Sequence, residues 1–388
     1  MFERLANRGA FWTLLVARVV YALNWYNIAS VFSFMAVDFG QGISGLGTLT
    51  SSFYLGIGLL QIPGAIVAVK LGPKLTATLG TLIMSMAVLV SGLSNTFALE
   101  ILARFLVGTG MALIFAPAVV LITQYFRRGA EGLAVGLYSS AYQIGGMLGV
   151  FGWAVVASTL GWRPSLLLSG TLGLATVAMI FLLVPRDSVL SRLRIGGPEL
   201  RRVLLDRNLL ALGVVATGVT VGSILLSSFL VYYLEKSLGD APAIAGALSA
   251  LTFVVPIFSS PFGGRIYDRS RRFRSLFVAS GSVSAVATVI TGFGGVYGPI
   301  IACVLAGFVS GLGFTVVMSL ARESRALGPE FRILSIAWVN SVSLTTSFIP
   351  PIVFSTIAGA DGYTAAWIGG GVLAFVLMLP ALLIKATR

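Results

Sequence analysis

Twelve long apolar stretches, separated by short charged segments, constrain the fold of this chain more than any other feature of its sequence. A helix that crosses the hydrocarbon core of a bilayer needs roughly 20 apolar residues. Only 10% of the 388 residues are charged and 57% are hydrophobic, and so few charges would not cover the surface of a soluble domain. The sequence therefore predicts an all-α integral membrane protein with 12 transmembrane helices. The predicted spans are 10–37, 46–69, 75–94, 97–125, 132–157, 164–184, 208–234, 243–264, 275–293, 297–320, 333–357 and 363–384.

The basic residues follow the predicted topology. The formal net charge is +13, which alone would also suit a nucleic-acid-binding protein. Cytoplasmic loops of membrane proteins collect Lys and Arg, and with the N-terminus inside, 22 of the 26 basic residues fall in inside segments. Of the other four, Arg163 and Lys236 lie outside, and Arg18 and Arg104 lie within spans. We therefore expect a multi-pass plasma membrane protein with both termini cytoplasmic, which contacts the lipid bilayer and binds no nucleic acid.

The longest polar segment, 185–207, divides the spans into two sets of six. We predict an N-terminal six-helix half at 1–185, a cytoplasmic linker at 186–207 and a C-terminal six-helix half at 208–388. Residues 199–205 of the linker suit a short basic helix on the inner membrane surface and a flexible tether equally well. The first apolar run is too long for a cleavable signal peptide, so we expect it to be retained as a span.

Weak internal similarity indicates that the two halves are related. Three pairs of segments recur in the same order, at offsets of about 200 residues. The pairs are Gly108 to Gly110 with Gly311 to Gly313, Gly161 to Arg163 with Gly362 to Thr364, and 63–74 with 262–273. Duplicated halves around a site near the bilayer midplane are the design of many secondary transporters.

Two motifs carry a resemblance to a known family. In the segment that begins at Gly264, an Asp follows the Gly at plus four, and further basic residues come after it. In span four, Arg104 is followed by Gly108 at plus four and Gly110 at plus six. Both patterns resemble signatures of the major facilitator superfamily (MFS), as does the tripeptide Gly161 to Arg163. The resemblance implies two pseudo-symmetric six-helix bundles that transport a solute by alternating access, although carriers of very different solutes share these motifs.

The loop motif implies a gate on the cytoplasmic side. The carboxylate of Asp268, at a helix end, suits a contact with basic groups or with the positive N-terminus of a neighbouring helix. The resemblance identifies that helix as span five, with Arg127 or Arg128 close by. The first copy of the motif has Val69 where the acid is expected, so its matching contact to span eleven is in doubt. The alternative is that the motif only anchors the topology. The gating candidates are Lys70, Gly264, Asp268 and Arg269.

Arg18 and Arg104 are the basic residues set inside predicted spans. A charged side chain deep in a span costs roughly 2.5–3.5 kcal/mol on insertion scales, so it usually faces a cavity or a partner. Glu100 precedes Arg104 by four residues, a spacing that lets the two side chains meet. Arg104 therefore belongs either to a neutralised structural pair or to a substrate or proton site. Arg18 has no acid nearby in the sequence, so it either snorkels to the inner headgroups or lines a cavity.

Polar and aromatic residues occur at helical spacing within several spans. Tyr21 and Trp25 share a helix face with Arg18, and Asn24 and Asn27 lie on an adjoining face. This composition is typical of a helix that lines a cavity rather than one that faces lipid. Each of these residues, taken singly, is equally suited to hydrogen bonding between helices. The predicted substrate-binding residues are Arg18, Tyr21, Asn24, Trp25, Asn27, Arg104, Tyr142, Gln143, Ser227, Trp338 and Asn340.

Several residue types that other chemistries require are absent from the sequence. There is no histidine and one cysteine, Cys303 in the tenth span, so neither a Cys/His zinc site nor an intrachain disulfide can form. No Lys follows a Gly, which excludes the P-loop pattern. We therefore expect no enzyme, no metal and no cofactor, and we expect the protein to be a monomer.

The sequence predicts a secondary active transporter that moves a small solute by alternating access. Two arginines against Glu100 favour an anion, and the planar guanidinium group suits carboxylate, phosphate or nitrate. Tyr and Trp near Arg18 favour an organic carboxylate, and Glu100 is the candidate for proton coupling. One alternative is a carrier of a neutral polar solute such as a sugar, or a drug exporter, with both arginines structural. An alternative of another class is a non-transporting membrane receptor or scaffold.

Overall fold

The structure, a computed structural model of the chain, describes residues 8–125, 131–185, 197–269, 272–293, 295–322 and 332–384. All regular secondary structure within these ranges is helical. The first group of helices consists of α1 (Arg8–Trp25), α2 (Asn27–Asp38), α3 (Ile43–Leu71), α4 (Pro73–Gly92), α5 (Phe97–Ala112), α6 (Phe115–Thr123), α7 (Glu131–Leu160) and α8 (Trp162–Leu183). After α9 (Gly197–Leu204), the second group consists of α10 (Arg207–Tyr233), η3 (Leu234–Leu238), α11 (Pro242–Arg269), α12 (Phe273–Thr291), α13 (Tyr297–Arg322), α14 (Arg332–Thr346), α15 (Ile349–Asp361), α16 (Tyr363–Met378) and η5 (Leu379–Leu383).

Twelve helical segments of the described chain are long and apolar enough to cross a membrane. The predicted and observed bounds differ by at most four residues. The largest differences are at the end of the seventh span, predicted at 234 and found at Leu238, and of the eleventh, predicted at 357 and found at Asp361. Large apolar side chains such as Leu182 and Val372 are exposed on the outside of the bundle, as contact with lipid requires. The predicted all-helical membrane fold with 12 spans is confirmed.

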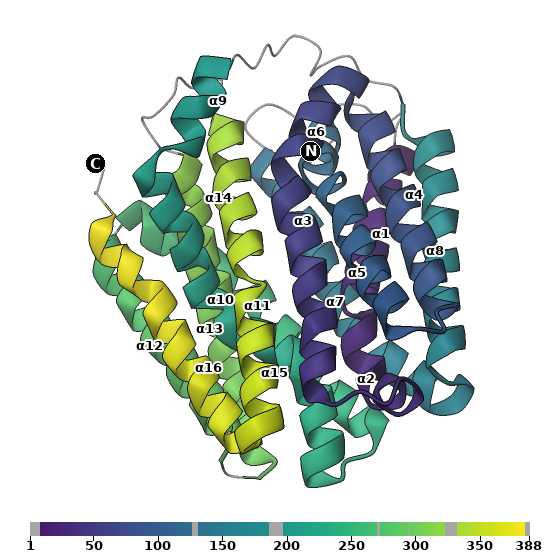
Figure 1. Cartoon of the computed structure of the whole chain (residues 1–388). Coiled ribbons are helices and arrows are strands. Elements are labelled where there is room, and N and C mark those ends of the chain that lie inside the picture. The colour runs from purple at the N-terminus through teal and green to yellow at the C-terminus, as the bar shows by residue number, and fades with distance from the viewer. Residues whose placement is uncertain are drawn as a thin grey trace.

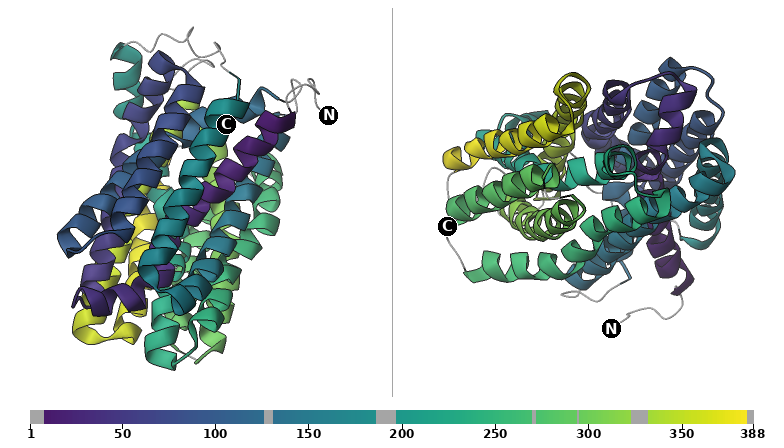
Figure 2. Two further views of the ribbon diagram at one scale, coloured as in Figure 1. Left: turned by 90° about the vertical axis from the view of Figure 1, so that its right-hand side faces the viewer. Right: turned by 90° about the horizontal axis from the view of Figure 1, so that it is seen from below.

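The two groups of helices stand side by side, with α1–α8 on the right and α10–η5 on the left of Figure 1. The start of α1, the end of η5 and α9 lie at one end of the bundle, the upper end in Figure 1 and in the left view of Figure 2. We call this end the terminal side and the other end the opposite side. Across the two groups, α3 packs against α14 and α15, α7 against α11, and α2 against α10. The division into two six-helix domains and a linker stays a prediction.

Three spans are broken into two helices each. Span one breaks at Tyr26, where the indole Nε1 of Trp153 donates to the carbonyl of Leu23 (3.0 Å). In an unbroken helix that carbonyl would accept from the N–H of Asn27, the first residue of α2. Span four breaks before Pro117, whose missing N–H leaves a helix carbonyl without a partner. Span eleven breaks just before Pro350 and Pro351, whose missing N–H groups interrupt helix hydrogen bonding.

Serine hydroxyl groups join the two groups of helices from the opposite side to the centre. Ser44 donates to the carbonyl of Ser355 (3.2 Å), and Ser51 donates to the carbonyl of Phe348 (2.7 Å). Ser341 donates in the other direction, to the carbonyl of Gly58 (2.7 Å). Aromatic packing closes the same region, because Phe32 of α2 contacts Phe229 of α10, and Phe229 contacts Phe354 of α15. The two groups are therefore held together on the opposite side.

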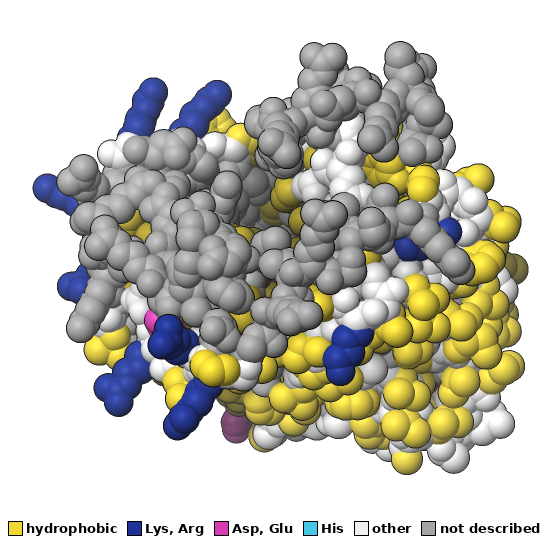
Figure 3. Space-filling view, turned by 90° about the horizontal axis from the view of Figure 1, so that it is seen from above, with side chains coloured by type: hydrophobic (Ala, Val, Ile, Leu, Met, Phe, Trp, Pro, Cys, Tyr) yellow, Lys and Arg dark blue, Asp and Glu magenta, His cyan; other side chains and the backbone are white. Residues whose placement is uncertain are grey.

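The terminal side carries the basic surface of the molecule. Figure 3 views this side and shows Lys and Arg side chains around its rim. Arg201 and Arg202 of α9 are exposed, whereas Val203 of the same helix is fully buried and packs in the apolar core of the second group. The sequence suited a short helix and a flexible tether equally well for residues 199–205. The structure has a helix there, Gly197–Leu204, with one apolar face on the bundle.

Two small residues within spans have packing roles. Gly108, from the span-four motif, lies where α5 meets α3, and a Cβ at this position would overlap the carbonyl oxygen of Phe53. Only Gly allows the two helix backbones to approach this closely. Cys303 is fully buried in α13, and its Sγ accepts a hydrogen bond from Oγ1 of Thr252 (3.2 Å). Cys303 therefore packs as a small core residue.

Candidate substrate site between the two helix groups

A small cavity lies between the two groups of helices near the break in span one. Its volume is about 20 Å³, which is room for about one water molecule. Three of the predicted substrate-binding residues, Trp25, Arg104 and Ser227, line it. The complete lining is Trp25, Tyr26, Ile28, Ala29, Thr50, Phe53, Tyr54, Arg104, Ser227 and Ser228. A cavity with walls from both groups can be reached from either side of the membrane only when the groups move apart.

Arg104 brings a buried positive charge to the cavity wall. Its side chain is 2% exposed, and Nη1 donates to Oδ1 of Asn27 (3.2 Å). The guanidinium carbon lies 5.0 Å from the centre of the Phe53 ring. Nε of Arg104 is buried and has no hydrogen-bond partner. Asn27 therefore fixes the guanidinium group through Nη1, and the donor at Nε has no protein partner.

Glu100, one helical turn before Arg104, is fully buried and held by two hydroxyl groups. Ser91 donates to its Oε1 (2.5 Å) and Ser94 to its Oε2 (3.0 Å). In the part of the chain that the structure describes, no direct ion pair joins Glu100 to Arg104. The two groups are neighbours rather than a closed pair, so the charge of Arg104 is only partly offset.

Asn24 and Asn27 form a buried hydrogen-bonded chain between α1, α2 and α8. Nδ2 of Asn27 donates to Oγ of Ser169 (3.3 Å), and Ser169 donates to Oδ1 of Asn24 (2.9 Å). Nδ2 of Asn24 donates to the carbonyl of Val20 (2.9 Å). Neither asparagine lines the cavity, and Asn27 reaches it only through Arg104. These residues position the site rather than form its surface.

Arg18 lies outside the cavity lining, in a cage of four aromatic rings. Its guanidinium carbon is 4.5 Å from the ring centres of Tyr21 and Tyr142, 4.6 Å from that of Tyr138 and 5.2 Å from that of Phe115. The side chain is 7% exposed, and its Nε and Nη1 atoms are buried without a hydrogen-bond partner. The predicted residues Arg18, Tyr21 and Tyr142 thus come together, but as a cluster separate from Arg104.

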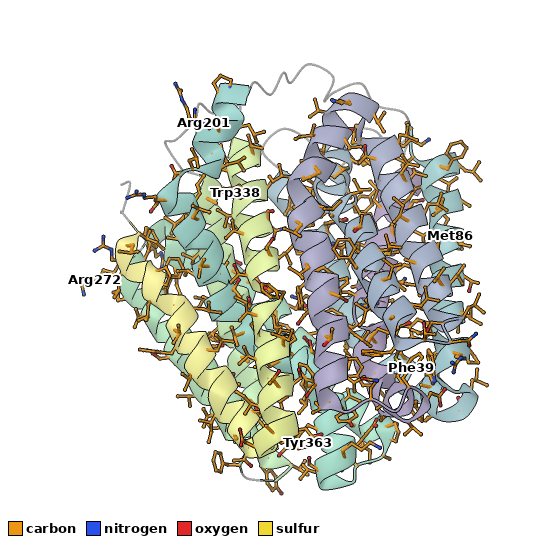
Figure 4. The ribbon with its side chains drawn as sticks, viewed as in Figure 1. Phe39, Met86, Arg201, Arg272, Trp338 and Tyr363 are labelled. Atoms are coloured by element: carbon orange, nitrogen blue, oxygen red, sulfur yellow. The ribbon has the colours of Figure 1, made fainter. Side chains whose placement is uncertain are left out.

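The remaining predicted binding residues lie away from the cavity. Gln143 follows Tyr142 on α7 and is partly buried. Trp338, labelled in Figure 4, is on the terminal half of α14, and its buried indole Nε1 has no partner. Asn340 is buried on the same helix. None of the three lines the cavity in the described structure, and their role in binding stays a prediction.

Several residues of the site were missed by reasoning from the sequence. Tyr26 and Ser228 adjoin the predicted residues Trp25 and Ser227 and line the same cavity. Phe115 belongs to the aromatic cage. Sequence offered a signal for Tyr26, because an aromatic hydroxyl between Trp25 and Asn27 already belonged to the most polar stretch of span one. For Phe115 there was no such signal, since Phe is the ordinary residue of a membrane span.

The family model of the Major Facilitator Superfamily matches residues 14–324 of this chain. The chain belongs to this superfamily. It is therefore a secondary transporter that moves a small molecule across a membrane, and it is not an enzyme. The predicted MFS resemblance is confirmed, and the receptor or scaffold alternative is excluded at this level.

Relatives of this MFS chain have diverse names. A probable sulfoacetate transporter, SauU, from Cupriavidus necator is 25% identical over 46% of this chain and 41% of its own length, so the chain spans less than half of that relative. The multidrug efflux protein YfmO from Bacillus subtilis is 23% identical over 98% of this chain and 94% of its own length. The crystal structure of a bacterial homolog to human lysosomal transporter Spinster, in an inward-facing and occupied conformation, superposes with a TM-score of 0.71 at 18% identity, covering 97% of both chains. That likeness shows the fold alone.

The Gly161 to Arg163 motif of this MFS chain joins two helix ends on the opposite side. Nε1 of Trp162 and Nη1 of Arg163 both donate to Oδ2 of Asp38, at 2.8 and 2.6 Å. Nη2 of Arg163 donates to the carbonyl of Ser94 (3.0 Å), whose hydroxyl group holds Glu100. The motif thus ties the end of α2 to the start of α8 and supports the pocket of Glu100.

The structure describes only some of the residues of the gate that the MFS loop motif predicts. Lys70 is exposed in the last turn of α3, and Arg269 is exposed at the end of α11. The side chain of Asp268 lies outside the described part of the structure, as do Arg127 and Arg128, and the same holds for contacts of Gly264. The gating role of these residues stays a prediction.

Proposed function

We propose that this transporter carries a small organic anion with a carboxylate or sulfonate group, and that Arg104 is its counter-charge in the cavity. The observation that carries the proposal is the balance of buried charge in the first group of helices. Among the described residues, two buried arginines stand against one buried carboxylate, and the oxygens of that carboxylate already accept from Ser91 and Ser94. A net positive interior is electrostatically complementary to an anion.

The lining of the cavity offers hydrogen-bond donors from both groups of helices. Arg104 on α5 has a free Nε, and Ser227 and Ser228 of α10 line the other side. The hydroxyl group of Ser227 donates to the carbonyl of Ile224 (3.2 Å) and would have to rotate to donate to a solute. An anion bound between them would contact both groups at once. Because the cavity of about 20 Å³ is smaller than a carboxylate solute, binding requires the groups to part, as alternating access implies.

Two further features of the proposal come from the same residues. Glu100 is the group through which protons would couple to transport, because its protonation would remove the negative charge beside Arg104 and strengthen the hold of Arg104 on an anion. The similarity to a probable sulfoacetate transporter supports the choice of anion class. Both termini are proposed to be cytoplasmic in the plasma membrane, since the basic terminal side would then face inward.

The test is uptake and binding of sulfoacetate, with glucose as the neutral comparison. Sulfoacetate should raise the melting temperature of the purified protein, because a ligand that binds only the folded state stabilises it. Arg104→Gln should weaken sulfoacetate binding in the cavity by at least ~30-fold, since loss of a buried charge contact costs on the order of 2–5 kcal/mol. Liposomes containing the wild type should accumulate labelled sulfoacetate faster when the outside is acidic.

Two control variants make the test decisive. Arg104→Lys keeps the charge and reports whether charge or guanidinium shape matters. Arg201→Gln removes an exposed charge of α9 and should leave binding unchanged. If liposomes with folded Arg104→Gln protein accumulate sulfoacetate at the wild-type rate, Arg104 is not the counter-charge and the proposal is wrong.

A second candidate function is export of an aromatic compound. Trp25, Tyr26, Phe53 and Tyr54 give the cavity an aromatic wall, and the match to the multidrug efflux protein runs along nearly the whole chain. This alternative predicts that ethidium efflux from cells survives Arg104→Gln and is lost in Tyr54→Ala. The anion proposal predicts no ethidium efflux at all.

A further inference from the structure

Arg18 is a buried cation whose hydrogen-bonding capacity is left open. It is 7% exposed, and its Nε and Nη1 atoms have no partner. Among the described residues no acidic side chain forms an ion pair with it. A buried polar donor without a partner is costly, and a buried guanidinium group is costlier still. An arrangement of this kind suits a group that receives its acceptors from a ligand.

The four aromatic rings stabilise the positive charge of Arg18, while its Nε and Nη1 atoms have no hydrogen-bond partner. The ring centres of Tyr21, Tyr138 and Tyr142 lie 4.5 to 4.6 Å from the guanidinium carbon, within the range of cation–π attraction. Phe115 of α6 closes the fourth wall at 5.2 Å. The cage therefore holds the cation in place, and the donors at Nε and Nη1 stay available to the oxygens of an anion.

A partition of three side chains separates the aromatic cage around Arg18 from the cavity beside Arg104. Arg18 precedes Tyr26 by eight residues on span one, about 12 Å toward the terminal side at 1.5 Å per residue. Tyr142 stands between the two, with its ring over Arg18 and its hydroxyl group 2.7 Å from the hydroxyl of Tyr26. Trp25 packs edge-on against Tyr142 at 5.9 Å. Trp25 and Tyr26 also line the cavity, so these three side chains form the partition.

The partition is built at the break in span one. Tyr26 is the residue at which span one breaks, and it is not part of either α1 or α2. On its other face Tyr26 packs against Phe253 of α11, with ring centres 4.5 Å apart. Tyr26 therefore contacts both groups of helices, and a movement of α11 away from α7 would free its ring. The hydrogen bond between Tyr26 and Tyr142 and the ring contacts of Tyr26 with Trp25 and Tyr142 would then hold the partition.

We propose that Arg18 forms a second anion-binding site, which takes the carboxylate or sulfonate group of the transported solute on the terminal side of the partition formed by Trp25, Tyr26 and Tyr142. The inference rests on the proposed anion transport and adds a separate station to it. The solute passes between Arg18 and Arg104, so its charge meets a buried cation on each side of the partition. The aromatic walls of the cage exclude a hydrated ion and favour an organic anion.

The experiment follows each arginine by its own signal. Protein labelled with ¹⁵N at the arginine Nε is titrated with sulfoacetate, and the Arg18 and Arg104 signals are assigned by their loss in Arg18→Lys and Arg104→Lys. Both signals are expected to shift, with different dissociation constants. In Arg104→Gln the Arg18 signal is expected to shift with an affinity within about twofold of the wild type, because separate sites act independently. The Arg201 signal of exposed α9 is the internal control and should not shift.

A transport measurement shows whether the second site lies on the path. Arg18→Gln is expected to slow sulfoacetate uptake into liposomes while the Arg104 signal keeps its dissociation constant. Tyr142→Phe removes the hydrogen bond to Tyr26 but keeps the ring over Arg18, so it should change the uptake rate and leave both affinities unchanged. Uptake by Arg18→Gln at the wild-type rate would overturn the role of Arg18 on the path.

The outcomes separate the two proposals. If the Arg104 signal shifts and the Arg18 signal does not, the second site is wrong and the proposed function stands. If the Arg18 signal stops responding in Arg104→Gln, the two arginines share one site, which also overturns the inference. If neither signal responds to sulfoacetate, the anion function fails and the inference fails with it.

Discussion

Arg18 and Arg104 lie in the same group of helices and are 7% and 2% exposed, but they are compensated by different means. Arg104 has a directional hydrogen bond to Asn27 and a carboxylate one helical turn away. Arg18 has four aromatic rings and, among the described residues, no acidic partner. The hydrogen bond to Asn27 occupies one of the five donors of Arg104 and fixes its position, whereas the ring faces stabilise the charge of Arg18 and leave its Nε and Nη1 without a partner. The way in which a buried charge is compensated thus determines how much of it remains for a ligand.

The comparison is tested most strongly by removing the charge of Arg104. We expect Arg104→Gln to lower the free energy of unfolding by about 3 kcal/mol, because Glu100 is left buried without a nearby cation. The charge-balanced double variant Arg104→Gln/Glu100→Gln should recover a large part of that loss. Arg18→Gln should destabilise less, because no carboxylate depends on Arg18. Thermal unfolding in detergent measures the wild type, these three variants and Glu100→Gln, and simple additivity of Arg104→Gln and Glu100→Gln would contradict the coupling of Glu100 with Arg104.

A second test changes the hydrogen bond that distinguishes Arg104. Asn27→Ala removes the acceptor for Nη1 of Arg104 and should cost about 1.5–3 kcal/mol, the usual value for a hydrogen bond to a charged group. It should also weaken sulfoacetate binding, because Arg104 loses its fixed position. Asn24→Ala is the matched control, since Asn24 shares Ser169 with Asn27 but does not touch Arg104. Equal binding losses in both variants would mean that the network, and not Arg104, sets the affinity.

The smallest expected effect concerns one ring of the cage. Tyr138→Leu should cost about 1 kcal/mol through lost cation–π attraction, whereas Tyr138→Phe should cost almost nothing because the ring face remains. In an Arg18→Gln background the cost of Tyr138→Leu should largely disappear. A double-mutant cycle by thermal unfolding gives this coupling energy. A coupling near zero would show that Tyr138 only fills space beside Arg18.

The spans could be predicted from the sequence to within four residues because hydropathy along the chain is a local property. Arg18 and Arg104 could be identified in the same way, since a basic residue inside an apolar stretch stands out by type alone. Their environments could not be predicted. The ring of Tyr142 comes to Arg18 from a helix more than 100 residues later in the chain, and only the packing of α1 against α7 joins them. A single sequence does not show that these two helices pack against each other.

The break in span one shows the same limit. No Pro or Gly lies near Tyr26 in the sequence, so nothing local predicts that the helix ends there. The cause is the indole of Trp153, which takes the carbonyl of Leu23 from a position 130 residues later. By contrast, the bend in span eleven was predictable, because Pro350 and Pro351 carry their effect on the backbone with them. Local causes can be seen in one sequence, and distant side chains cannot.

The serine contacts between the two groups have a mechanical consequence. Ser51 and Ser341 each donate a hydroxyl hydrogen to a backbone carbonyl of the facing helix. When the helices separate, each hydroxyl can rotate to the carbonyl four residues earlier in its own helix, the bond that Thr81 and Ser85 already make in α4. For these two serines no hydrogen bond is lost on parting, and none has to be recovered on return. These serine contacts therefore hold the two groups together without storing energy. The solute gradient has only to set the direction in which thermal motion separates the groups.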